Sequence, residues 1–167
     1  LVACGNPYSE QITKVKDMQT ELQGYEEAVN TVDVSILREM QHEYGKVMNV
    51  IKAKYIDSNG VDQRFGRMAN LYKGIKKTKG IPAAVENTLV DIAEQKTQLE
   101  NLLSDLEREA IPELDSVNYF VDLERVAMNE IKMMAEKLRV NYQTLVGVQD
   151  TVYPYMLGIV DSLNRIR

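Results

Sequence analysis

The chain has few of the residues from which catalytic and metal sites are usually built. Its 167 residues include one cysteine, one histidine and no tryptophan. A single cysteine cannot form an internal disulfide, and one histidine cannot supply the two Glu-x-x-His motifs of a di-iron bundle. The same shortage leaves no Ser-His-Asp triad without His42 and no thiol nucleophile besides Cys4. We therefore expect no enzyme, no metal site and no cofactor.

The chain also lacks a basic surplus and long apolar runs. Its 25 acidic residues outnumber its 20 basic residues, which gives a net charge of −5. Binding to a phosphate backbone requires a basic surface, so no nucleic-acid partner is expected. No stretch after Cys4 approaches the roughly 18 consecutive apolar residues of a transmembrane helix.

Glycine and proline are sparse, with nine and four residues, and this profile is typical of long helices. From Ser9, whose side chain can cap a helix N-terminus, apolar residues recur at spacings of three and four, which predicts amphipathic helices with a narrow buried seam. The first stretch has its seam at Val15, Met18, Leu22, Tyr25, Val29, Val32, Leu37, Met40, Tyr44, Val47 and Ile51. Residues 30–35 are poor in helix formers, and the step from Val32 to Leu37 is five, so we expect a kink or an interruption there.

Two further stretches follow a predicted turn at residues 57–60. The second has its seam at Met68, Leu71, Ile75, Val85, Leu89, Ile92, Leu99, Leu103, Leu106 and Ala110. Steps of seven residues from Met68 reach Leu89, Leu103 and Ala110, so the apolar seam keeps its register across residues 80–82. This favours a kink at residues 80–82 rather than a reversal of the chain. After a connection at residues 111–115, where Asp115 or Ser116 can cap the next helix, the third seam runs through Val117, Phe120, Ala127, Ile131, Met134, Leu138, Leu145, Val148, Val152, Tyr155, Ile159 and Ile166. Only Glu124, Asn141 and Ser162 interrupt it, and Pro154 lies off it.

Three stretches of about fifty residues joined by short turns predict an all-α fold, an elongated antiparallel three-helix bundle with kinked helices. At 1.5 Å per residue the body would be a rod roughly 75 Å long. If every interruption is a true turn, the alternative is a shorter four- to six-helix bundle. We assign residues 1–8 to a signal-peptide remnant, a lipidation site and a linker, and residues 9–167 to a single helical domain.

The residues Leu1, Val2, Ala3 and Cys4, followed by Gly5, resemble a bacterial lipobox. The resemblance implies that a signal peptide is removed before Cys4 and that Cys4 then carries fatty-acyl chains. Each buried methylene contributes about 0.8 kcal/mol, so several acyl chains hold a protein on a membrane. In such lipoproteins an Asp directly after the modified cysteine favours retention at the inner membrane. This chain has Gly5 at that position, which implies an outer-membrane lipoprotein. Residues 6–9 do not match an acidic surface-export run, which favours the side facing the periplasm.

Two clusters are candidate partner surfaces. Tyr142, Tyr153 and Tyr155 are candidates for an exposed aromatic patch. The second cluster consists of Lys73, Lys76, Lys77 and Lys79, which could contact anionic lipid headgroups or peptidoglycan carboxylates, or could form a solvated helix face.

Other polar and aromatic residues have structural interpretations. The methionines and tyrosines at Met18, Tyr25, Met40, Tyr44, Met68, Met134 and Tyr155 are interpreted as core. Glu124 and Asn141 either fix the register of the seam or mark an open part of it. Glu39 and His42 have the Glu-x-x-His spacing, but in the frame of the seam His42 points outward.

The leading hypothesis is a non-enzymatic, lipid-anchored helical protein of the bacterial envelope that acts as a binding or spacer module. In broad terms it resembles the helical lipoproteins of Gram-negative bacteria. Its expected partners are the membrane, through the lipid, and a protein or peptidoglycan, and its oligomeric state is open. The alternative is a cytoplasmic spectrin-like or coiled-coil adaptor in which Cys4 is incidental. A third hypothesis is a small-ligand carrier or an enzyme, with a polar cavity in the bundle interior lined by Glu124, Asn141 and Tyr142.

Overall fold

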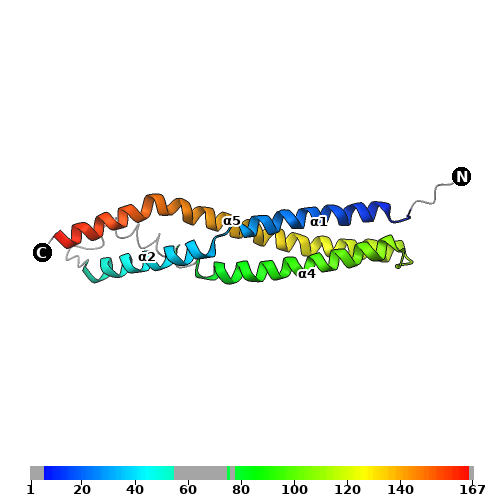
Figure 1. Ribbon diagram of the computed structural model, residues 1–167, viewed down its shortest axis with the longest axis horizontal. Helices are drawn as coiled ribbons and strands as arrows, with labels where there is room; N and C mark the ends of the chain where they lie inside the picture. Colours follow the sequence, from blue (N-terminus) through cyan, green and yellow to red (C-terminus); the bar gives the residue numbers. More distant parts are fainter. Residues whose placement is uncertain (1–5, 55–74, 76–77, 166–167) are drawn as a thin grey trace. The chain divides into compact units, whose positions relative to one another are not determined.

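The computed structural model describes residues 6–54, 75 and 78–165, and within these ranges it is helical and contains no strand. The helices are α1 (Ser9–Asn30), α2 (Val34–Lys54), α4 (Ile81–Glu107) and α5 (Leu114–Arg165), with a short 3-10 helix, η1 (Thr78–Gly80), before α4 (Figure 1). The predicted all-α class and helical-bundle character are confirmed.

The chain divides into two compact units. Unit 1 comprises residues 1–31 and 84–139, and unit 2 comprises residues 32–83 and 140–167. Helix α5 contributes its first half to unit 1 and its second half to unit 2.

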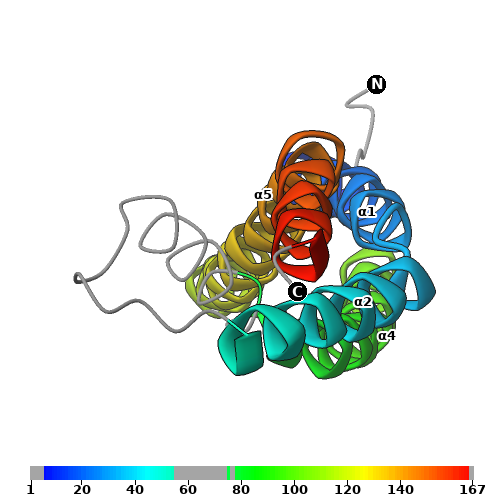
Figure 2. The same ribbon diagram turned by 90° about the vertical axis from the view of Figure 1, so that its left-hand side faces the viewer.

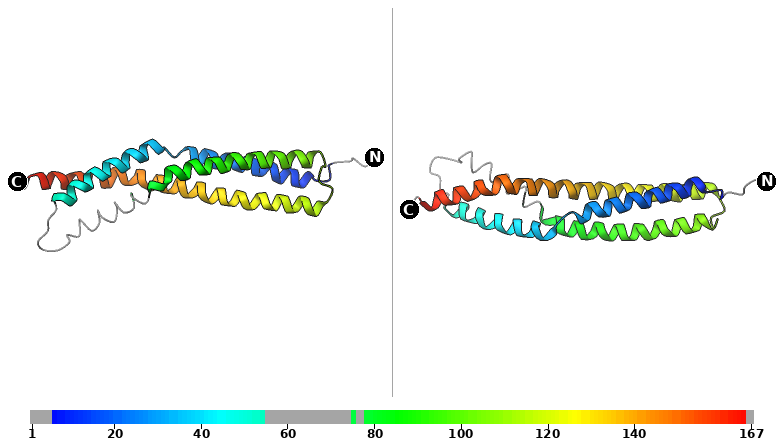
Figure 3. Two further views of the ribbon diagram at one scale, coloured as in Figure 1. Left: turned by 90° about the horizontal axis from the view of Figure 1, so that it is seen from below. Right: turned by 45° about the horizontal axis from the view of Figure 1, so that its top comes forward.

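Unit 1 is an antiparallel arrangement of α1, α4 and the first half of α5, which lie side by side (Figure 3). Polar contacts between the helices give their directions. Those made by α1 are Gln11–Asn118, Lys16–Glu107, Glu21–Arg125 and Glu26–Lys96. As the residue number rises along α1, that of the partner rises along α5 and falls along α4. Helices α1 and α5 are therefore parallel, and α4 is antiparallel to both.

The core of unit 1 is a seam with three-four spacing on each helix. Its buried residues are Tyr8, Gln11, Val15, Met18, Leu22 and Val29 from the α1 segment, Val85, Thr88, Ile92, Gln95, Leu99, Leu102 and Leu106 from α4, and Val117, Val121, Met128, Ile131, Ala135 and Leu138 from α5. The α1 residues at the predicted positions are buried, apart from Tyr25, which is half-buried.

On α4 and α5 part of the predicted seam is wrong by one residue. Phe120 and Met134 are 42% and 40% exposed, whereas the adjacent Val121 and Ala135 are buried. Of the positions counted in sevens from Val117, Ile131, Leu138 and Leu145 are buried, whereas Val152 and Ile159 are half-buried. Where a repeat has a second buried position, it follows four residues later rather than three. Tyr155 is likewise exposed, and Met156 takes the buried position.

The predicted seam residues Val85, Ile92, Leu99 and Leu106 of α4 are buried, but the positions at 89, 103 and 110, reached by counting sevens from Met68, are wrong. Leu89 and Leu103 are half-buried and Ala110 is exposed, whereas Thr88 and Leu102 are buried. In α5 the structure places Glu124 near the seam, where its Oε2 accepts a hydrogen bond from Gln95 Nε2 at 2.5 Å. Asn141, predicted on the seam, is exposed.

The predicted interruption after α1 is confirmed at residues 31–33. Asp33 caps α2, because its Oδ1 accepts hydrogen bonds from the backbone N–H groups of Ser35 (2.9 Å) and Ile36 (3.1 Å). The predicted Ser9 cap is wrong, since Ser9 is the first helical residue of α1 and the cap position belongs to Tyr8. Asp115 likewise lies inside the first turn of α5, which begins at Leu114.

In unit 2, α2 packs against the second half of α5 (Figure 2). The buried side chains among the described residues of this unit are Val32, Leu37, Met40, Tyr44, Val47, Met48, Ile51, Ile75, Ile81, Pro82, Leu145 and Met156, which confirms the predicted α2 seam. Pro154 is exposed within α5, as expected for a residue off the seam. The predicted turn at residues 57–60 and the seam residues Met68, Leu71 and Ile166 lie outside the described residues.

Candidate partner-binding surfaces

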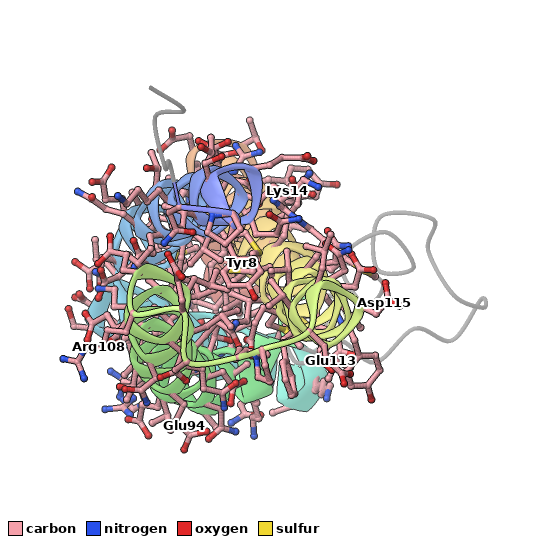
Figure 4. All side chains as sticks on the ribbon, turned by 90° about the vertical axis from the view of Figure 1, so that its right-hand side faces the viewer. Tyr8, Lys14, Glu94, Arg108, Glu113 and Asp115 are labelled. Carbon is pink, nitrogen blue, oxygen red and sulfur yellow. The ribbon has the colours of Figure 1, made fainter. Side chains whose placement is uncertain are left out.

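Asn6 and Tyr8 dock onto the end of unit 1. Asn6 Nδ2 donates a hydrogen bond to the Leu106 carbonyl (2.9 Å), and the Tyr8 hydroxyl donates one to the Ile111 carbonyl (2.6 Å). Tyr8 is only 6% exposed and lies between the ends of the three helices (Figure 4). These residues, which the sequence analysis assigns to a linker, therefore contact the helical body. Cys4 itself lies outside the described residues.

The turn that receives Asn6 is a Schellman motif at the end of α4. The N–H of Ala110 donates to the Asp105 carbonyl (2.9 Å), and the N–H of Glu109 donates to the Leu106 carbonyl (3.2 Å). Glu109 has φ 54, the left-handed conformation that this motif requires. The Leu106 carbonyl thus accepts from both Glu109 and Asn6, which joins the start of the described chain to the α4–α5 turn.

The structure does not bring the three candidate tyrosines together. Tyr142 and Tyr153 are half-buried, whereas Tyr155 is exposed. Residues two apart on a helix do not share a face, so Tyr153 and Tyr155 point to different sides of α5. Tyr153 instead contacts α2, with its ring centroid 5.1 Å from that of Tyr44 and its hydroxyl 3.5 Å from Glu43 Oε2.

A groove of about 350 Å³ lies between α2 and α5 in unit 2 at this tyrosine pair. It is lined by Ile36, Glu39, Met40, Glu43, Tyr44, Gln149 and Tyr153. Burial raises the pKa of Tyr44 to about 12, and Tyr153 and Asp150 add to the shift. The hydrogen bond from Lys46 Nζ (2.8 Å) is the main reason that the pKa of Glu43 is lowered. Tyr44 is therefore neutral at physiological pH, and its ring is buried in the core of unit 2.

The remaining candidate residues are exposed or lie outside the described ranges. Lys79 is exposed in η1, while Lys73, Lys76 and Lys77 lie outside the described residues. Glu39 and His42 are exposed, which confirms the outward orientation of the Glu-x-x-His pair.

A second groove, which the sequence analysis missed, lies between α4 and α5 in unit 1. It has a volume of about 360 Å³ and is lined by Asp91, Glu94, Gln95, Gln98, Ala127, Glu130, Ile131 and Met134. The sequence carries one signal of it, because α5 has adjacent apolar residues at Tyr119–Phe120 and at Met133–Met134. Only one side of a helix can face the core, so such pairs indicate an additional apolar face.

The described part of the chain holds no group of three or more His, Cys, Asp or Glu side chains placed to bind a metal ion. None of its helices is long and apolar enough to cross a membrane. Comparisons of the chain with family models, curated proteins and solved structures find no match.

Proposed function

We propose that this chain is a lipid-anchored helical protein of the bacterial envelope that acts as a non-enzymatic binding or spacer module. The observation that carries the proposal is the lipobox-like sequence Leu1-Val2-Ala3-Cys4, with Gly5 after it. Gly5 favours the outer membrane, and residues 6–9, which do not match an acidic surface-export run, favour the side facing the periplasm.

The docking of Asn6 and Tyr8 indicates which end of unit 1 an anchor at Cys4 would hold. A chain segment extends by at most about 3.6 Å per residue, so the step from Cys4 to Asn6 spans at most about 7 Å. Asn6 is held on the α4–α5 turn by its bond to the Leu106 carbonyl. Acyl chains on Cys4 would therefore hold this end of unit 1 close to the bilayer surface, with the helices leading away from it.

We also propose that the whole chain forms the elongated antiparallel three-helix bundle predicted from its sequence, rather than a four- to six-helix bundle. Unit 1 already has this arrangement, and the 52-residue helix α5 runs through both units. At 1.5 Å per residue, α5 has about 78 Å of helix axis, a length that suits a spacer.

A binding or spacing role fits the contacts that the described polar side chains make. The buried polar residues Gln11 and Gln95 bond to Asn118 and Glu124 on α5, so they serve packing between helices. His42, the single histidine, is exposed on α2. The exposed side chains of the helices are thus available for contacts with a partner.

Fractionation of the full-length gene product in a Gram-negative host tests the proposal. We expect the natural protein in the membrane fraction and Cys4→Ser in the soluble fraction, because the substitution removes the acylated thiol. The matched control Cys4→Ser/Ser9→Cys keeps one cysteine but moves it out of the lipobox, and it should also be soluble. Membrane association of Cys4→Ser would contradict the proposal. A cytosolic natural protein with a free thiol would support the adaptor alternative.

A further inference from the structure

Helix α5 carries an apolar face in unit 1 that is separate from its core seam. The exposed residues on this face are Tyr119, Phe120, Leu123, Val126, Met133 and Met134. They comprise two pairs of neighbours, at 119–120 and 133–134, and steps of three, four and seven between the pairs and the other residues place them on one side of the helix. Met133 is 70% exposed. Single exposed apolar residues are ordinary, but several on one helix face, with the exposed Glu130 among them, mark an interaction surface.

The α4–α5 groove of unit 1 borders this face and has an apolar floor with an acidic rim. Ala127, Ile131 and Met134 supply apolar surface, and the rim carboxylates are those of Asp91, Glu94 and Glu130. Among the described residues that line this groove there is no lysine or arginine.

The rim carboxylates differ from those at the α1 contacts of the same unit. Glu21 and Glu26 on α1 pair with Arg125 (2.8 Å) and Lys96 (2.5 Å). In the part of the chain that the structure describes, the carboxylates of the groove rim have no hydrogen-bonded or ion-paired partner. The groove therefore combines exposed apolar surface with uncompensated negative charge.

We propose that the α4–α5 surface of unit 1 binds an amphipathic helix of another protein, one whose apolar stripe is flanked by lysines or arginines. The stripe would cover Met134 and the neighbouring apolar face, and the flanking cations would approach the rim carboxylates. The inference rests on the binding part of the proposed function, but it does not require a lipid on Cys4.

The charge of the rim favours this occupant over the two obvious others. Anionic lipid headgroups would be repelled by Asp91, Glu94 and Glu130, whereas helices that lie on bilayers carry basic flanks. A second copy of the chain would bring a second acidic rim against the first, and like charges at an interface lower its stability.

Peptide binding to the full chain carrying Cys4→Ser tests the inference. The probes are two synthetic helical peptides with the same leucine stripe, one flanked by lysines and one by glutamates, and their binding is measured by fluorescence anisotropy. We expect the lysine-flanked peptide to bind at least about tenfold more tightly, and the difference to shrink at high salt because screening weakens charge pairs. Equal affinities of the two peptides would overturn the proposal.

Paired charge variants locate the binding surface. Glu94→Lys/Glu130→Lys should weaken binding of the lysine-flanked peptide about tenfold. The control Glu100→Lys/Glu136→Lys changes the net charge by the same amount at exposed residues that do not line the groove, and it should change the affinity less than about twofold. Met134→Ser should weaken binding of both peptides. An equal loss in the groove and control variants would overturn the proposal.

Two further measurements test the other occupants with the same Cys4→Ser chain. Sedimentation should show no dimer that depends on Met133 and Met134, and flotation with phosphatidylglycerol vesicles should show no binding through this face. A dimer abolished by Met133→Ser/Met134→Ser would assign the face to a second copy. Vesicle binding abolished by the same variant would assign it to the membrane. Either result would overturn the proposal.

Discussion

At the scale of single residues, the turn after α4 contains a backbone conformation that suits glycine. Glu109 has φ 54, the only positive value for a non-glycine residue in the described chain. A side chain in this conformation costs about 1 kcal/mol, and the C′ position of a Schellman motif is usually glycine. We expect Glu109→Gly to raise the free energy of unfolding by roughly 1 kcal/mol in urea titrations. The same substitution at Glu100, inside α4, should lower it by a similar amount, and equal effects at both sites would contradict the assignment.

The cap of α2 is also testable at one residue. The Ser35 hydroxyl and the Ile36 and Ser35 amides bond to Asp33 and lower the pKa of its carboxyl. The cap therefore stabilises the fold fully above the ordinary Asp pKa of about 3.9 and loses this effect as pH falls through the lower folded value. In a carbon-detected NMR titration we expect Ser35→Ala to raise the Asp33 midpoint toward its ordinary value. An unchanged midpoint would show that the hydroxyl does not hold the carboxylate.

The buried Tyr44 predicts how the stability of the fold changes at alkaline pH. Its pKa is raised to about 12 by burial, so the fold favours the neutral phenol. This stabilisation is complete below pH of about 10 and is lost as pH rises through the folded value. Urea unfolding at pH of about 9 and about 11 should show a larger loss of stability for the natural chain than for Tyr44→Phe. Equal losses would show that another group causes the alkaline sensitivity.

At the scale of the helices, the sequence predicts α1 and α2 better than α4 and α5. In α1 and α2 the seam is the main apolar stripe, so the buried positions could be identified from spacing alone. In α5, residues such as Phe120 and Val121 are both apolar, and spacing does not say which one faces the core. In α4 the buried positions include the polar residues Thr88 and Gln95. A search for apolar residues at helical spacing does not select them, and it selects the half-buried Leu89 instead of Thr88.

Two methionines of α5 distinguish the observed register from the predicted one. Met128 is buried at 1% exposure, whereas Met134 is 40% exposed. Met128→Ala should lower the free energy of unfolding by about 2–5 kcal/mol, because it leaves a cavity in the core. Met134→Ala should change it by no more than about 0.5 kcal/mol. Chemical denaturation of both variants checks this. A larger loss of unfolding free energy for Met134→Ala than for Met128→Ala would support the predicted register, in which Met134 is buried.

The candidate sites were less predictable than the helices for a related reason. A binding face depends on which apolar residues remain after the core is packed, and this requires the register of α5 to be known. Tyr153 and Tyr155 are close in sequence, but the helix turns them to different sides. The hydrogen bond from Asn6 to the Leu106 carbonyl joins residues far apart in the chain, so no local sequence pattern predicts it.

At the scale of the whole molecule, the proposed elongated bundle predicts a large radius of gyration. A rod roughly 75 Å long has a radius of gyration of about 22 Å, whereas a compact domain of this length has about 15 Å. Small-angle X-ray scattering of the Cys4→Ser chain should give a value near the larger figure. A value near the smaller figure would support the shorter four- to six-helix bundle, and the spacer role would then lose its basis.

Mass spectrometry of the N-terminal peptide from the full-length gene product tests the lipid anchor most directly. We expect the mature protein to begin at Cys4, with diacylglycerol on the sulfur of this residue and an acyl chain on its amino group. A peptide in which an unmodified Cys4 is still preceded by Val2 and Ala3 would contradict it.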